Sequence, residues 1–231
     1  MTEDVEGDRK SVASPPTLVT DPIAVARKEA SNALRQFDAV IARIDQARSE
    51  SSRFRLRPSD LLNLNRLALD GISRFAGNYR PSGIYITGSK HEPPPAETVP
   101  ALTEELCDYV NDSFDSASPI HLAAYVMWRL NWIHPFDDGN GRTARAASYL
   151  VLCIKLESRL PGKPTIPDLI VDKKGPYYAA LEAADKMFAK SGKIDLAAME
   201  SLLEGLLSAQ LVSAVELARG GPLGPSPEKS R

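Results

Sequence analysis

The sequence is short of cysteine and of net charge, and both shortages exclude classes of protein. Its two cysteines, Cys107 and Cys153, have neither the spacing of a metal site nor the number for a disulfide framework. With 28 basic and 30 acidic residues, the formal net charge is −2. That charge creates no global attraction to nucleic acid or to an anionic membrane. We therefore expect no nucleic-acid partner, and a reducing compartment such as the cytoplasm.

Long apolar stretches are also missing from the sequence pattern. No apolar run approaches the roughly 20 residues that span a bilayer, and the polar, acidic N-terminus does not resemble a secretory signal. We therefore expect no membrane partner. Hydrophobic residues make up 43% and charged residues 25% of the 231 residues, which suits a globular domain with a sizeable core.

The remaining pattern predicts a mostly helical chain. Residues 1–20 form an N-terminal segment and linker, residues 21–217 the folded domain, and residues 218–231 a tail expected to be disordered. Asp21 and Pro22 are a good N-cap and first-turn pair for a helix to about Ala47. Further helices are expected from about Pro58, Pro119, Arg142, Pro176 and Ile194. The apolar stripe of the first helix is predicted to contain Ala26, Ala30, Ala33, Phe37, Val40 and Ile44.

The most informative stretch is His134–Arg145, which contains a glycine-framed turn. Gly139, Asn140 and Gly141 are small or tolerate left-handed backbone, and they come directly before an apolar helical segment. The free N–H groups and the dipole of a helix N-terminus attract anions. The turn therefore predicts a site for phosphate groups.

Charged side chains surround this turn. Arg142 and Arg145 lie on nearly the same face of the first helical turn, and guanidinium groups match phosphate oxygens well. Asp138 would repel phosphate alone but would bridge to it through Mg²⁺. His134 titrates in a range suited to a general base, and Pro135 should end the preceding helix there. Each of these features alone is commonly structural, but their joint occurrence favours a nucleotide-polyphosphate site.

At every defined position this run resembles the Fic-family signature: histidine, proline, phenylalanine, any residue, acid, glycine, asparagine, glycine, arginine, two residues, arginine. The resemblance implies an all-α Fic fold and transfer of AMP from ATP to a Ser, Thr or Tyr hydroxyl of a target protein. It implies that His134 is the base, that Asp138 holds Mg²⁺, and that Phe136 anchors the loop. The turn would be the anion hole, and the two arginines would contact the β- and γ-phosphates. Kinase relatives carry lysine at the position of Gly141, which argues against that branch.

Two further segments extend the resemblance. Residues 80–91 alternate apolar and polar residues between glycines, which predicts a small β-hairpin. This hairpin is similar to the flap with which the family pairs target segments through backbone hydrogen bonds. Tyr178 and Asp185 would contact adenine or ribose, although many relatives carry asparagine in place of Asp185. The flap residues expected to position the target are Gly83, Ile84, Tyr85, Ile86 and Thr87.

The segment Thr2–Gly7 resembles the family's inhibitory motif. Glu6 would pair with Arg145 and compete with the γ-phosphate for its guanidinium. In relatives, such a glutamate can also position a water that removes AMP. One alternative function is therefore removal of AMP. Two others are transfer of another nucleotide and nucleotide binding without turnover. The resemblance also implies that the chain can form homo-oligomers.

Overall fold

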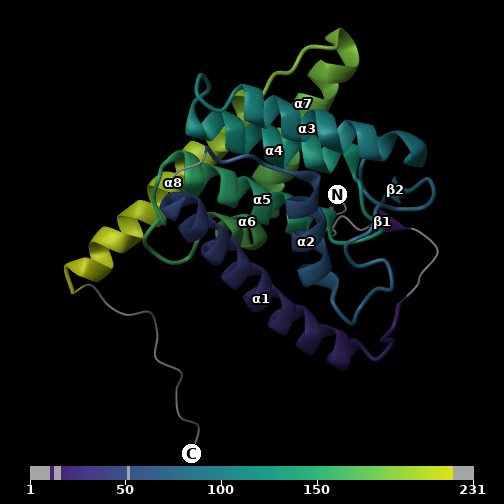
Figure 1. Ribbon diagram of the computed structural model, residues 1–231, viewed down its shortest axis with the longest axis horizontal. Coiled ribbons are helices and arrows are strands. Elements are labelled where there is room, and N and C mark those ends of the chain that lie inside the picture. Colours follow the sequence, from purple (N-terminus) through teal and green to yellow (C-terminus); the bar gives the residue numbers. More distant parts are fainter. Residues whose placement is uncertain (1–10, 13–16, 51–52, 221–231) are drawn as a thin grey trace, which may run out of the picture.

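The computed structural model describes residues 11–12, 17–50 and 53–220. These residues form eight α-helices, one short 3₁₀ helix and a two-stranded sheet (Figure 1). The all-α class expected from the sequence is confirmed. Glu6 and all but the first residues of the tail 218–231 lie outside the described part of the chain.

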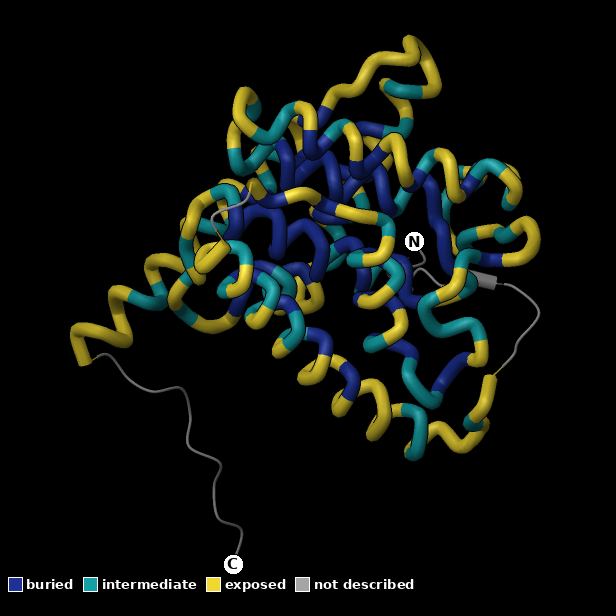
Figure 2. The backbone as a smooth tube through the Cα atoms, in the orientation of Figure 1, coloured by how far each residue is buried: buried dark blue, intermediate teal, exposed yellow. Residues whose placement is uncertain are grey.

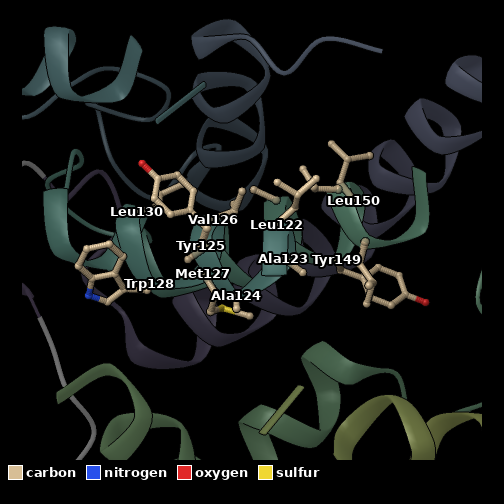
Figure 3. Close-up of a cluster of buried hydrophobic side chains, with 14 of the residues drawn as sticks. Leu122, Ala123, Ala124, Tyr125, Val126, Met127, Trp128, Leu130, Tyr149 and Leu150 are labelled. Atoms are coloured by element: carbon tan, nitrogen blue, oxygen red, sulfur yellow. The ribbon is translucent and has the colours of Figure 1, made fainter. Parts of the chain in front are cut away.

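Two helices, α4 (Pro119–Ile133) and α5 (Asn140–Lys155), form the centre of the core. The N-terminus of α4 is capped by Ser118, whose hydroxyl accepts from the N–H of His121 at 3.0 Å, and Pro119 begins the helix. Apolar residues surround α4, so every side chain from Leu122 to Leu130 is buried (Figure 3). The loop between the two helices is therefore held at both ends by the core.

The other helices cover this pair (Figure 2). On one side α1 (Pro22–Ser49) packs on α5 and on α2 (Pro58–Leu69). The 3₁₀ helix Ala96–Thr98 leads into α3 (Val99–Asp112), which packs on α4. The chain then continues through α6 (Ile166–Asp172), α7 (Lys174–Ser191) and α8 (Ala197–Ala218).

The predicted start of α1 is confirmed, because the Asp21 carboxylate accepts from the N–H of Ala24 at 3.0 Å. The predicted stripe is wrong in its first half, where Ala26, Ala30 and Ala33 are exposed. The buried positions there are Asn32 and Gln36. Their amides donate to carbonyl oxygens of α2 and of the residue that follows it: Leu64, Ala68 and Asp70. Polar side chains therefore fill the α1–α2 contact, and two of the three acceptors, the carbonyls of Ala68 and Asp70, lie at the end of α2, where helix carbonyls need donors.

The expected flap contributes one strand, β2 (Tyr85–Ile86), rather than a hairpin within residues 80–91. Its partner is β1 (Ser11–Val12), with Ser11 opposite Ile86 and Val12 opposite Tyr85 in antiparallel register. The prediction of a hairpin is corrected, because the second strand comes from the N-terminal segment. Further along the chain, Leu18 contacts the segment that follows α2, because its N–H donates to the carbonyl of Ile72 at 2.8 Å.

One helix, α8, is long and apolar enough to cross a membrane by length and composition. The sequence-based expectation that no segment meets this criterion is therefore wrong. Its first half packs on α4 and α7 within the fold, with Met199 and Leu203 buried. A core helix of a globular domain meets the same criterion, so the observation does not define a membrane segment.

Candidate active site

His134 is the C-cap of α4 and adopts left-handed backbone, with φ 51° and ψ 58°. Pro135 disfavours continuation of the helix, which ends at Ile133 as expected. The Nδ1 atom lies 3.1 Å from the carbonyl oxygen of Asn131. Because a carbonyl only accepts, Nδ1 carries the proton in this contact, and Nε2 of the neutral ring has the lone pair of a base.

Burial controls the protonation of His134. The side chain is 6% exposed, and this desolvation lowers the pKa of His134 from 6.5 to about 4. The hydrogen bond to Asn131 and the charge of Asp138 raise the pKa, whereas His91 and Arg80 lower it further. The imidazole is therefore neutral near pH 7, as a proton acceptor must be.

Arg80 fixes the backbone at the start of the loop between α4 and α5, although the sequence pattern assigns it no role. Its buried guanidinium donates to the carbonyls of His134 at 2.8 Å and Ser82 at 2.9 Å, and also to that of Pro94. Its own N–H donates to the carbonyl of Pro135 at 2.9 Å. One side chain thus ties the left-handed turn at His134 to the two ends of the flap segment.

The loop after His134 is held by buried contacts. Phe136 is fully buried, as expected for an anchor. The side-chain amide of Asn140 accepts from the N–H of Phe136 at 2.9 Å and donates to its carbonyl at 2.8 Å. Asn65 of α2 donates to the carbonyl of Asp138 at 2.9 Å. The side chain of Asn140 therefore stabilises the loop, and its contribution to an anion hole is confined to its backbone N–H.

The N-terminus of α5 lines a cavity of the protein. Gly139 precedes it with φ 77°, and no side chain of the described residues caps this helix end. A Cβ atom on Gly139 would lie 3.0 Å from Nδ2 of Asn65, so glycine is required by both backbone and space. At Gly141 a Cβ atom would lie 3.3 Å from Nη1 of Arg145. Small residues thus leave backbone N–H groups and a guanidinium accessible to an anion.

Arg142 lies between two carboxylates. Its guanidinium donates to Asp138 at 3.0 Å and to Glu29 of α1 at 3.0 Å. Glu29 was not predicted from the sequence, because it lies 113 positions away from Arg142. These two acids neutralise an arginine at a helix N-terminus, where a cation opposes the dipole.

These groups line one cavity of about 410 Å³. The cavity contains His134, Asp138, the turn at residues 139–141, both arginines and Glu29. Tyr178 and Asp185 of α7 form part of another wall, and Asp185 accepts from the indole N–H of Trp128 at 2.9 Å. Of the five predicted flap residues, Ile86 lines the cavity, whereas Gly83, Ile84, Tyr85 and Thr87 do not.

A metal at this site would rely on few protein ligands. Within the described residues, no group of three or more His, Cys, Asp or Glu side chains is arranged to hold a metal ion. Asp138 is exposed and lines the cavity beside the open helix N-terminus. One carboxylate with phosphate oxygens and waters suits Mg²⁺, which seldom uses an all-protein cage.

Known proteins resemble this chain in sequence and in fold. Residues 55–152 match the model of the Fic/DOC family. Protein adenylyltransferase fic-1 of Caenorhabditis briggsae is 28% identical over 185 residues, which cover 78% of this chain and 35% of that protein. Protein adenylyltransferase fic-1 of Caenorhabditis elegans is 34% identical over 128 residues, 54% of this chain and 23% of that protein.

The fold is shared with a Fic-domain signaling protein of Bacteroides thetaiotaomicron, whose crystal structure superposes with a TM-score of 0.66 at 23% identity. The match covers 84% of this chain and 75% of that one. The family match over residues 55–152 and the relatives show that the chain contains a Fic/DOC family domain, and its fold is that of the solved Fic structure. The chain spans about a third of the length of the first curated relative it matches.

Proposed function

We propose that this protein is an adenylyltransferase that moves AMP from ATP to a hydroxyl of a target protein. One observation carries the proposal: the base Nε2 of His134 and the uncapped N-terminus of α5 belong to the same cavity. A binding module needs the helix terminus but has no use for a neutral, oriented imidazole. The relatives named protein adenylyltransferase support the same activity.

Each residue of the cavity has a separate role in the proposed transfer. Nε2 of His134 takes the proton of a Ser, Thr or Tyr hydroxyl as its oxygen attacks the α-phosphorus. The bond from that phosphorus to the β-phosphate oxygen breaks, and pyrophosphate leaves. Backbone N–H groups at residues 139–141, with Arg142 and Arg145, stabilise the charge that grows on the phosphates. Asp138 would hold Mg²⁺, which neutralises charge on the leaving group. Tyr178 and Asp185 would face the nucleoside.

Two features of the N-terminal segment support regulation in the same chain. Glu6 lies in a motif of inhibitory type, and in our proposal its carboxylate competes with the γ-phosphate for Arg145. Independently, β1 pairs with the flap strand β2. A target strand that used this edge of β2 would have to displace Ser11–Val12.

The test is incubation of the protein, Mg²⁺ and a protein extract with ATP labelled at either the α- or the γ-phosphate. We expect protein-bound label from the α-position alone. Label from the γ-position would indicate a kinase, and nucleotide retained without protein labelling would indicate a binding module. Loss of label from premodified targets would instead support removal of AMP, and competition by GTP, CTP or UTP would test the donor.

Variants assign the roles within this assay. His134→Ala should abolish labelling and retain ATP, whereas His121→Ala, at the far end of α4, should keep both. Glu6→Gly should increase labelling in the parent and have no effect in an Arg145→Ala background. Equal labelling of Glu6→Gly and the parent protein would remove Glu6 from the proposal.

A further inference from the structure

Part of the apolar stripe that the sequence places on α1 lies on another cavity rather than in the core. Ala30 and Ala33 of this stripe are exposed, and so is Leu34 beside them, at 69% (Figure 2). With Phe37 they line a cavity of about 340 Å³ that α1 forms with α5 and α6, here called the α1 cavity. Exposed apolar residues that line a hollow are typical of a binding surface.

The walls of the α1 cavity are mostly apolar. Phe37 of α1 and Tyr149 of α5 lie with their ring centroids 6.5 Å apart, and Val40 beside them is buried. Pro167 and Val171 of α6 add to the apolar lining. Ligand cavities commonly have volumes of about 300–1,000 Å³, an apolar lining and few polar groups. The α1 cavity therefore has the size and the lining to hold one small apolar group.

Most polar side chains that line this cavity have partners within the fold. The amide of Gln36 donates to a backbone carbonyl of α2 at 2.9 Å. The carboxylate of Asp168 accepts from the N–H of Thr165 at 2.9 Å and from its hydroxyl at 2.7 Å. Arg142 donates to two carboxylates. These contacts stabilise the walls, and they leave the acid of the lining already occupied.

Two cations of the lining differ from these groups. Among the residues that the structure describes, no carboxylate forms an ion pair with Arg145 or Lys163. Arg145 comes from α5, and Lys163 from the loop before α6. An apolar cavity with two such cations is complementary to a molecule that has an apolar body and one anionic head, because the head receives charge-assisted hydrogen bonds.

We propose that the α1 cavity binds a small free amphiphile with a carboxylate head, such as a medium-chain fatty carboxylate. The carboxylate binds Arg145 and Lys163, and the apolar body packs on Ala33, Phe37 and Tyr149. Arg145 also lines the cavity of the candidate active site. A carboxylate on its guanidinium therefore competes with the γ-phosphate of ATP, a consequence that rests on the proposed function. The two ligands should weaken each other's binding by the same factor.

Isothermal titration calorimetry with decanoate, in the absence of nucleotide, tests the site itself. Decanol has a chain of the same length without the charge, and we expect it to bind at least about tenfold more weakly than decanoate. Lys163→Gln should weaken decanoate binding about three- to tenfold. Ala33→Phe should abolish binding because the new ring fills the cavity. Ala26→Phe, also exposed on α1 but outside the cavity, should leave binding unchanged.

A second titration measures the coupling between the two cavities. Saturating decanoate should weaken ATP binding about three- to tenfold. The affinity for AMP should stay the same, because AMP has no β- or γ-phosphate for Arg145 to contact. The effect on ATP should vanish in Arg145→Ala. Absence of protein labelling by ATP would refute the transferase activity, whereas decanoate binding is measured without nucleotide and does not depend on that activity.

The opposite results overturn the proposal. Absence of decanoate binding, or binding that Ala33→Phe does not affect, overturns the site. Equal binding of decanol overturns the anionic class of ligand, and unchanged ATP affinity in saturating decanoate overturns the coupling. Decanoate binding to Glu6→Gly but not to the parent protein would assign Arg145 to Glu6 instead of a free amphiphile. Circular dichroism verifies the fold of each variant, and Lys163→Gln tests the site without adding bulk to it.

Discussion

The buried histidine should make the stability of the protein depend on pH in a defined window. Its pKa is about 4 in the folded protein and about 6.5 in an unfolded chain. Between these values the unfolded state binds more protons, so stability falls as the pH falls. At pH 7 both states are neutral at this position, and below pH 4 both are charged.

The magnitude follows from the shift. A difference of about 2.5 pKa units corresponds to about 3 kcal/mol lost between pH 6.5 and pH 4. Carboxyl groups also titrate there, so the parent must be compared with His134→Asn, which has a neutral polar group of similar size. We expect the free energy of unfolding of the parent to fall by about 3 kcal/mol relative to the variant across this window.

Urea unfolding followed by circular dichroism at half-unit pH intervals provides the measurement, with the denaturant slope checked for equality between the two proteins. A stability difference that stays constant from pH 6.5 to pH 4 would refute the burial argument. It would mean that the imidazole reaches water in the folded state. A decrease confined to pH values near 6.5 would mean that the pKa of His134 is depressed only slightly.

Three smaller predictions concern the surroundings of the base. Arg80→Lys keeps the positive charge but loses the planar guanidinium that binds several carbonyls at once. We therefore expect the turnover number for protein labelling to fall about 10- to 100-fold while nucleotide affinity stays nearly unchanged. Equal losses of turnover and of nucleotide affinity would contradict a positioning role. Glu29→Gln should raise ATP affinity about two- to fivefold in calorimetry, because an exposed ion pair is weak, and should leave AMP affinity unaltered. Gly139→Ala should cost about 1–3 kcal/mol in urea unfolding. Gly192→Ala, with similar φ but open space around it, should cost less, and equal costs would exclude the contact with Asn65.

Local signals account for the parts of the structure that the sequence predicted. Asp21 and Ser118 cap their helices through residues three positions away, and proline follows each of them. The loop His134–Arg145 contains its own turn and its own anchor. Such features need no knowledge of the rest of the chain, so they are visible in a single sequence.

Contacts over long separations account for what was missed. Arg80 lies 54 positions before His134, and Glu29 lies 113 before Arg142. No periodicity links residues so far apart, and an arginine or glutamate in a surface pattern is ordinarily solvated. The pairing of β1 with β2 is also long-range, so the alternating pattern of residues 80–91 predicted a strand correctly but its partner wrongly.

The floor and the rim of the cavity that contains His134 differ in how well they tolerate substitutions. Its floor is the loop between α4 and α5, where His134, Phe136 and Gly139 are buried and a substitution disturbs the core. Its rim, with Glu29 and the flap, is exposed to solvent, where most substitutions cost little stability. In the proposed function, selection can therefore alter which target protein approaches His134 without endangering the fold. Under the proposed function, related proteins with this fold can therefore evolve different targets while the reaction stays the same.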